Sequence, residues 1–159
     1  MKKGFSYNTP LGIIWIAESG GSITNISFTK PDSFLEEETD LTREAASQLG
    51  EYFNGSRKQF ELPLNPAGTE FQKKAWNALL QIPYGETRSY KQQAELVGNA
   101  KASRAVGMSN NRNPIMIVIP CHRVVGANGS LTGYAGGLNV KRFLLDLENP
   151  SGNLFHIKN

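Results

Sequence analysis

The chain has 159 residues, an ordinary globular composition and a formal net charge of +3, which fits one or two small domains with a buried core. No run approaches the roughly 18 apolar residues of a membrane span, and no apolar segment follows the N-terminal lysines, so we expect neither a membrane helix nor a secretory signal. One cysteine and two histidines exclude an internal disulfide, suit a reducing compartment, and leave too few soft ligands for a structural zinc site unless carboxylates contribute.

The first 65 residues predict a small α/β domain. Ser19-Gly20-Gly21 supplies a hairpin turn, and the alternation of apolar residues predicts strands at 5–7, 12–17 and 23–28. Residues 31–40 are acidic and polar, which favours a loop. We find no chemistry in this part of the chain and assign it a scaffold role.

A helix and an edge strand complete this domain. Asp40 can cap a helix whose apolar residues recur at helical spacing, and Asn54-Gly55 ends it. Residues 60–64 predict a further strand, which a proline restricts to a sheet edge. Asn65-Pro66-Ala67-Gly68 is a cluster of helix and strand breakers. We therefore place a scaffold domain at 1–65 and a second domain at 69–159.

The second domain opens with three predicted helices. Thr69 and Gln72 form a capping box for the first helix. The next two helices are predicted at 89–97 and 100–108, and Gly98-Asn99 lies between them. Helix, glycine-containing turn and helix is the helix-turn-helix pattern, but helical hairpins are common and the pattern alone is a weak signal.

Charge is unevenly distributed along the chain. Residues 1–68 contain 6 Lys and Arg against 9 Asp and Glu, a net charge of −3, and the remainder contains 11 against 5, a net charge of +6. A basic half suggests a polyanion partner, with a solvated basic face as the alternative. For a DNA partner, Lys101, Ser103 and Arg104 are candidate phosphate or groove contacts, and Ala102 is small enough for close approach to a duplex.

The single cysteine, Cys121, follows five apolar residues at 115–119, which predict a buried strand. Pro120 must then bend the chain, so the thiol is placed at the end of a rigid core element. His122 and Arg123 are groups that lower the pKa of a neighbouring thiol. The alternative is an inert core cysteine. Because successive strand residues point to opposite faces, a contact between thiol and imidazole would need a turn or a water.

The remaining residues predict a glycine-rich loop or hairpin at 124–134, a final helix and an irregular tail at 149–159. Asn139 is the candidate cap of the helix. Glu148 ends it, where a carboxylate is unfavourable for the helix dipole, and this suggests that the carboxylate has a partner. Four apolar residues are predicted to face inward: Val140, Phe143, Leu144 and Leu147.

Three ordered motifs resemble those of the O6-alkylguanine-DNA alkyltransferases, or methylated-DNA–protein-cysteine methyltransferases. They are NRNP at 111–114, IPCHRVV at 119–125 and GYAGGLNVKRFLLDLE at 133–148. The resemblance covers about Thr69 to Glu148. It implies an α+β fold, with a small ribonuclease-H-like N-terminal domain followed by a mainly helical domain that contains a winged-helix-like helix-turn-helix.

The resemblance also implies a function and catalytic roles. An alkyl group on O6 of a flipped-out guanine, with O4-alkylthymine as a further candidate, is transferred irreversibly to Cys121, once per protein. His122 takes the thiol proton through a water, and Glu148 orients the imidazole and balances its charge. Asn113 holds the turn around the cysteine, and Tyr90 donates a hydrogen bond to the leaving guanine. On their own, the last two are interpreted as a turn residue and a core aromatic.

A DNA-binding mode follows from the same resemblance. The helix-turn-helix enters the minor groove, where readout is nearly independent of sequence. Arg104 fills the gap left by the flipped base, although a solvated phosphate contact is the plainer alternative. Some relatives carry serine at position 135, so the alanine here offers no side-chain donor. The residues that line the guanine pocket are Val124, Tyr134 and Ala135.

Two other functions compete with DNA repair. Relatives that bind lesions without repairing them lack the acceptor cysteine, so Cys121 argues against that class. A thiol hydrolase would need an oxyanion hole, and its histidine usually lies elsewhere in the chain. We therefore expect a repair protein without metal or cofactor, with double-stranded DNA as partner. We expect it to be monomeric but able to associate side by side on DNA, in the cytoplasm of a prokaryote and associated with the nucleoid.

Overall fold

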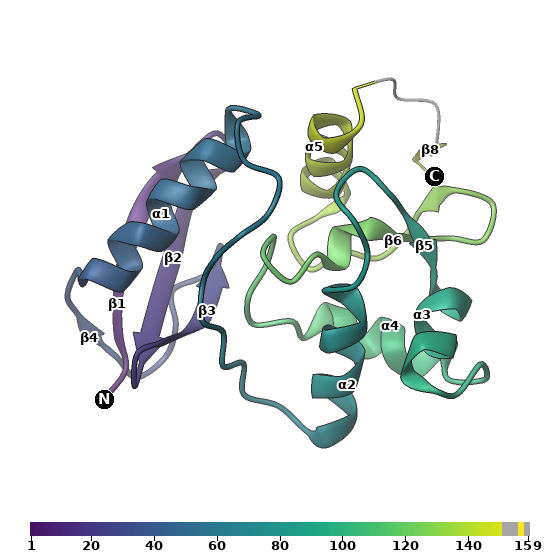
Figure 1. The fold of residues 1–159 in the computed structure, drawn as a ribbon, viewed down its shortest axis with the longest axis horizontal. Coiled ribbons are helices and arrows are strands. Elements are labelled where there is room, and N and C mark those ends of the chain that lie inside the picture. Colours follow the sequence, from purple (N-terminus) through teal and green to yellow (C-terminus); the bar gives the residue numbers. More distant parts are fainter. Residues whose placement is uncertain (151–155, 158–159) are drawn as a thin grey trace. The chain divides into compact units, whose positions relative to one another are not determined.

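The computed structural model describes residues 1–150 and the backbone of His156–Ile157 (Figure 1). It divides into two compact units, Met1–Ala67 with Pro114–Met116, and Gly68–Asn113 with Ile117–Asn159. Three residues that the sequence places in the second domain therefore group with the first unit. No helix among the described residues is long and apolar enough to cross a membrane.

The first unit is a four-stranded sheet with one helix. Its strand order is β3-β2-β1-β4, and its elements are β1 (Lys3–Thr9), β2 (Gly12–Ser19), β3 (Ser22–Ser27), β4 (Leu35–Glu36) and α1 (Asp40–Phe53). The three predicted strands and their hairpin are confirmed, because Gly20 and Gly21 adopt φ values of 60° and 84° between β2 and β3. In Figure 1, α1 lies along the sheet, and Leu49 and Tyr52 of this helix are buried, as is Ile16 of β2.

Three details of this unit differ from the sequence prediction. Thr39, rather than Asp40, caps α1, because its hydroxyl accepts a hydrogen bond from a backbone N–H of the first turn. The acidic loop contains β4, which pairs in parallel with β1. The predicted edge strand at 60–64 is reduced to an isolated bridge between Leu64 and Ile23, since a proline in that segment has no N–H to donate.

Three helices open the second unit: α2 (Glu70–Leu79), α3 (Tyr90–Val97) and α4 (Ser103–Asn111). Thr69 caps α2 with the predicted box, and Ser89 caps α3 in the same way. The helix α4 begins later than predicted because Asn99 extends the turn. The Asn99 side chain accepts a hydrogen bond from the N–H of Lys101 at 3.0 Å, and its carbonyl accepts one from Ala102 at 3.0 Å. Lys101 therefore lies in the turn and Ala102 at the N-cap position.

The apolar segment before Cys121 is buried, but it is not the predicted strand. Only Ile115 forms a bridge, with Ile26. Ile117 has a φ of 72°, a left-handed conformation that a β-branched residue rarely adopts. Residues Cys121–Arg123 form a short 3₁₀ helix. The strand prediction is wrong because a continuous apolar run fits a buried irregular turn as well as it fits a buried strand.

Two short parallel strand pairs and a last helix complete the second unit. They are β5 (Arg88–Ser89) with β6 (Val124–Val125), β7 (Ser130–Leu131) with β8 (His156–Ile157), and α5 (Leu138–Glu148). The strand β8 departs from the predicted irregular tail, whose residues 151–155 and 158–159 lie outside the described residues.

The start and the inward face of α5 both differ from the prediction. Gly137, with a φ of 96°, stands at the N-cap position, so Asn139 is not the cap. Phe143 is 38 % exposed. Leu144 is buried as predicted, whereas Val140 and Leu147 are half-buried. The buried residues of this helix are Lys141, Leu144, Leu145 and Glu148, and apolar periodicity alone did not indicate that a lysine would be among them.

Candidate active site

A tight turn places the Cys121 thiol in the interior of the second unit. The residue is 4 % exposed, and its N–H donates to the carbonyl of Ile119 at 2.8 Å, across Pro120. The Asn113 amide Nδ2 donates to that same carbonyl at 2.8 Å and lies 3.4 Å from Cys121 Sγ. One amide group therefore holds both the turn and the sulfur.

The thiol needs a base before it can act as a nucleophile. Burial raises the pKa of Cys121, while the Asn113 hydrogen bond and the charge of Lys141 partly offset this effect. The predicted lowering by His122 and Arg123 is not what the structure shows, because the Arg123 guanidinium is directed to Glu148 instead. Since the thiolate is the reactive form, a proton acceptor must stand close to the sulfur.

His122 is the adjoining residue in the 3₁₀ helix and has the properties of such an acceptor. Its Nε2 lies 2.7 Å from Glu148 Oε2, and both side chains are buried. The carboxylate assigns the proton to Nε2, which leaves Nδ1 as an acceptor. Among the described residues, Nδ1 is buried without a hydrogen-bond partner. Burial lowers the pKa of His122, so the imidazole is neutral and able to take a proton at neutral pH.

The Glu148 carboxylate is fixed by several donors. Arg123 donates from Nε to Oε1 at 2.8 Å and from Nη2 to Oε2 at 3.0 Å, and the Gly85 N–H lies 3.2 Å from Oε1. Burial alone would raise the pKa of Glu148, but His122 and Arg123 hold it well below its usual range. The partner that the sequence suggests for this carboxylate is therefore the pair of His122 and Arg123.

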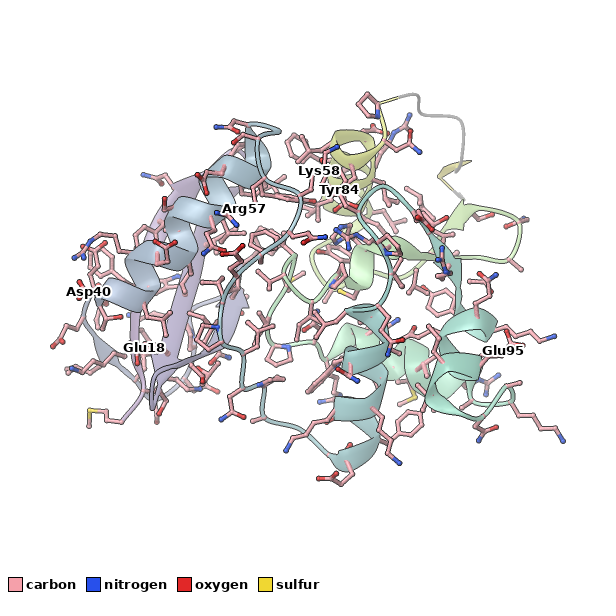
Figure 2. All side chains as sticks on the ribbon, in the orientation of Figure 1. Glu18, Asp40, Arg57, Lys58, Tyr84 and Glu95 are labelled. Carbon is pink, nitrogen blue, oxygen red and sulfur yellow. The ribbon has the colours of Figure 1, made fainter. Side chains whose placement is uncertain are left out.

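Arg123 is a structural member of the site, a role that the sequence reasoning did not assign to it. Its Nη1 donates to the carbonyl of Ile82 at 2.7 Å. Its guanidinium carbon lies 5.8 Å from the ring centre of Tyr84. Figure 2 labels Tyr84 in the loop after α2, and its hydroxyl donates to the Leu147 carbonyl in the last turn of α5 at 3.4 Å. The sequence feature that could have indicated this role is the position of a charged residue within the largely apolar segment 115–125.

Two tyrosine hydroxyls interact electrostatically with Cys121. Tyr90 donates to the carbonyl of Thr132 at 2.9 Å. Tyr134 has a buried hydroxyl that lacks a partner among the described residues. Burial, together with the charge of Cys121, raises the pKa of both tyrosines, so both hydroxyls keep their protons at neutral pH.

Lys141 is a residue that the sequence reasoning missed. It is fully buried, and Nζ donates to the carbonyls of Val124, Thr132 and Gly133. The signal lies in the spacing: Lys141 stands seven residues, about two helical turns, before Glu148, so both occupy one face of the helix.

The other predicted residues lie in different surroundings. Val124, three residues after Cys121, is buried, whereas Ala135 is exposed. Arg104 and Lys101 are exposed, and among the described residues neither side chain makes a hydrogen bond or an ion pair. Ser103 begins α4 and is half-buried. Ala102 packs into the core with other small residues, namely Ala75, Ala94 and Val106.

Comparisons with known proteins identify the family of this chain. Residues 70–150 match the model of the 6-O-methylguanine DNA methyltransferase DNA binding domain, and residues 3–66 match that of its ribonuclease-like domain. A methylated-DNA–protein-cysteine methyltransferase of Methanosarcina acetivorans is 54 % identical over an alignment of 149 residues, and the match covers 89 % of this chain and 95 % of the relative. The constitutive enzyme of Bacillus subtilis is 48 % identical over an alignment of 153 residues, and the match covers 90 % of this chain and 93 % of the relative.

Solved structures show the same likeness. The crystal structure of Mycobacterium tuberculosis O6-methylguanine methyltransferase superposes with a TM-score of 0.86 at 42 % identity, covering 94 % of both chains. The M. tuberculosis protein in complex with DNA gives a TM-score of 0.87 at 43 % identity, covering 93 % of both chains. With both family models matched in order and relatives near half identity over most of its length, the chain belongs to the 6-O-methylguanine DNA methyltransferase family.

Proposed function

We propose that this protein repairs DNA by transferring an alkyl group from O6-alkylguanine in a duplex to its own Cys121. The observation that carries this proposal is the buried thiol held by Asn113, followed directly in the 3₁₀ helix by a histidine whose Nε2 faces a fixed carboxylate. We infer the substrate, alkylated DNA, from the relatives, which are methylated-DNA–protein-cysteine methyltransferases. O4-alkylthymine presents a similar alkyl–oxygen bond and is a second candidate substrate.

The reaction uses the site residues in sequence. His122 Nδ1 accepts the Cys121 proton through a water, and Glu148 balances the imidazolium that forms. The thiolate attacks the alkyl carbon, so a sulfur–carbon bond forms as the bond from carbon to O6 breaks. Guanine leaves as an anion with the electron pair and takes up one proton through water, which balances the proton that the thiol gave to His122. Tyr90 donates a hydrogen bond to the departing base. The product is a thioether, which cannot regenerate the thiol, and each protein acts once.

Access to the base requires that it leave the duplex. Arg104 extends from α4 and fills the gap in the stack, while Lys101 and Ser103 contact phosphates near the start of that helix. Val124, Tyr134 and Ala135 line the pocket for the extruded guanine. Ala102 acts from the core, where it supports the first turn of α4.

The cellular setting follows from the same proposal. The relatives named above are archaeal and bacterial. We infer a prokaryotic cytoplasm with nucleoid association, where the protein acts as a monomer that can associate side by side on DNA.

The proposal is tested by base analysis of a duplex that carries one O6-methylguanine. Increasing amounts of protein are added, and the DNA is hydrolysed and separated. We expect guanine to replace O6-methylguanine with one base repaired per protein. Repair of many bases by one protein, or cleavage of the DNA in place of repair, would contradict the proposal.

A further inference from the structure

Lys141 is a buried cation with an uncommon set of partners. Its side chain is 0 % exposed. Its ammonium donates to three carbonyl oxygens, among them those of Thr132 at 3.0 Å and Gly133 at 3.3 Å. Within residues 1–150, no ion pair joins it to a carboxylate. A lysine is almost never fully buried without such a partner, so packing alone does not account for this residue.

The three carbonyls belong to two segments that border the thiol. Val124 directly follows the 3₁₀ helix that carries Cys121, and it accepts one hydrogen bond from Nζ. Thr132 and Gly133 lead into Tyr134. One ammonium group therefore ties the chain after the nucleophile to the chain before the pocket tyrosine.

The Thr132 carbonyl has two donors. It accepts the Tyr90 hydroxyl at 2.9 Å and the Lys141 ammonium at 3.0 Å. A carbonyl oxygen has two lone pairs and can accept both. Tyr90 must leave Thr132 to donate to a base, and a buried carbonyl left without a donor would oppose that rotation. With Lys141 present, the carbonyl keeps one hydrogen bond.

We propose that Lys141 is a positioning residue for the transfer reaction: its ammonium holds both segments as one pocket wall and satisfies the Thr132 carbonyl when the Tyr90 hydroxyl turns to the extruded base. This inference rests on the function proposed above and adds a residue to it. It assigns Lys141 an effect on the rate of transfer, through Tyr90, and no contact with the base.

The charge of Lys141 gives this role a pH dependence. The groups that interact electrostatically with the ammonium are the Cys121 thiol and the His122 imidazole. The hydroxyls of Tyr90 and Tyr134 interact in turn with Cys121. Burial lowers the pKa of Lys141 to about 8, and Cys121 opposes this shift.

Whether the transfer rate rises or falls with increasing pH shows which of these groups is titrating. Thiol ionisation would make transfer faster as pH rises, and both tyrosines have pKa values raised above 10.0. A decline in rate above about pH 8 therefore reports loss of the Lys141 proton.

The experiment measures single-turnover transfer from a saturating O6-methylguanine duplex across about pH 6 to pH 10. The proteins are wild type, Lys141→Met, Tyr90→Phe and the double variant, with Arg142→Met as the control on the exposed face of the same helix. Duplex affinity and melting temperature are measured for each protein. Wild type is assayed first, and its failure to transfer would contradict the proposed function itself.

We expect Lys141→Met to slow transfer about tenfold or more, since a misplaced proton donor loses part of an effect worth at least about 100-fold. Its duplex affinity should stay near that of wild type, and its alkaline decline should disappear. Its melting temperature should fall, because buried carbonyls lose a donor, so rates are compared where each protein is folded. The double variant should be no slower than Tyr90→Phe, because both changes act on one hydrogen bond. The control should match wild type.

Wild-type rate and an unchanged alkaline decline in Lys141→Met would overturn the inference, as would fully additive losses in the double variant. If Lys141→Met does not fold, the wild-type profile decides the question. In that case, a rate that rises steadily to about pH 10 while the protein stays folded would overturn the role of the ammonium.

Discussion

The two units of this protein differ in what they bury. In the first unit, the buried polar side chains are those of Thr42 and Gln48, and the rest of its described core is apolar. In the second unit, the interior also contains charged groups, those of Arg123, Lys141 and Glu148. Buried charge is costly unless it is paired and hydrogen-bonded. Stability of the fold is enough to explain the buried residues of the first unit, whereas the buried charges of the second unit also have a role in the reaction.

Replacing the nucleophile should have the largest effect on activity. We expect Cys121→Ala to abolish alkyl transfer and to keep duplex binding, because the proposed DNA contacts lie at α4. The checks are base analysis for transfer and fluorescence anisotropy for binding. A folded variant that has lost both activities would contradict the separation of DNA surface and thiol.

Breaking the charge cluster should have the next largest effect. Glu148→Gln leaves the Arg123 guanidinium buried without its carboxylate, which should destabilise the protein by roughly 3–5 kcal/mol and slow transfer. Urea unfolding and single-turnover rates measure both effects. The control is Glu95→Gln, an exposed position on α3 (Figure 2), where the change should stay within about 0.5 kcal/mol. Equal losses in the two variants would contradict the account.

The same cluster predicts how stability changes with pH. Glu148 has a lowered pKa, so its contribution is present above its unfolded value of about 4.3 and is lost as pH falls through the folded value. Burial also lowers the pKa of His122, so stability falls as pH drops below about 6.5, where the unfolded state takes up a proton more readily. Unfolding at a series of pH values should show this decline. A flat curve from about pH 6.5 to pH 4 would refute it.

Alkylation of Cys121 should loosen the second unit. A methyl group added to the buried sulfur crowds the turn that Asn113 holds, and overpacking costs about 1–3 kcal/mol. Hydrogen exchange should increase for amides of the second unit and stay constant in the first sheet. An unchanged melting temperature after complete methylation would argue against this crowding.

The smallest predicted effects compare two equivalent helix caps. Thr39→Ala and Ser89→Ala each remove an N-cap hydroxyl and should each cost about 1 kcal/mol. Only Ser89→Ala should also slow transfer, because Ser89 directly precedes Tyr90 at the start of α3. Rates normalised to the folded fraction test this, and equal slowing by both variants would contradict the division between scaffold and site.

Local sequence rules predicted the elements whose cause is local. The three strands, the Gly20-Gly21 hairpin and the Thr69 cap depend on alternation, turn residues and one capping side chain. The start of α4 was wrong because Asn99 accepts hydrogen bonds within the turn, and this signal competes with helix propensity.

Local sequence rules predicted the candidate site less well. The residues themselves pointed to Cys121, His122 and Glu148, and the resemblance supplied their roles. Nothing local distinguished a strand at 115–119 from the buried turn that the structure contains. The inward face of α5 was assigned wrongly because Lys141 is buried through tertiary hydrogen bonds, and periodicity counts lysine as exposed. Arg123 was assigned to the thiol because the two are close in sequence, whereas in the structure its guanidinium binds Glu148.

The central claim is that Cys121 accepts one alkyl group from DNA. It is tested most directly by intact-protein mass spectrometry after incubation with a duplex that contains one O6-methylguanine, followed by peptide mapping. We predict a mass increase of one methyl group in place of one hydrogen, on the peptide that contains Cys121, and no second addition. An unmodified mass despite tight duplex binding would contradict the claim and indicate a protein that senses lesions without repairing them.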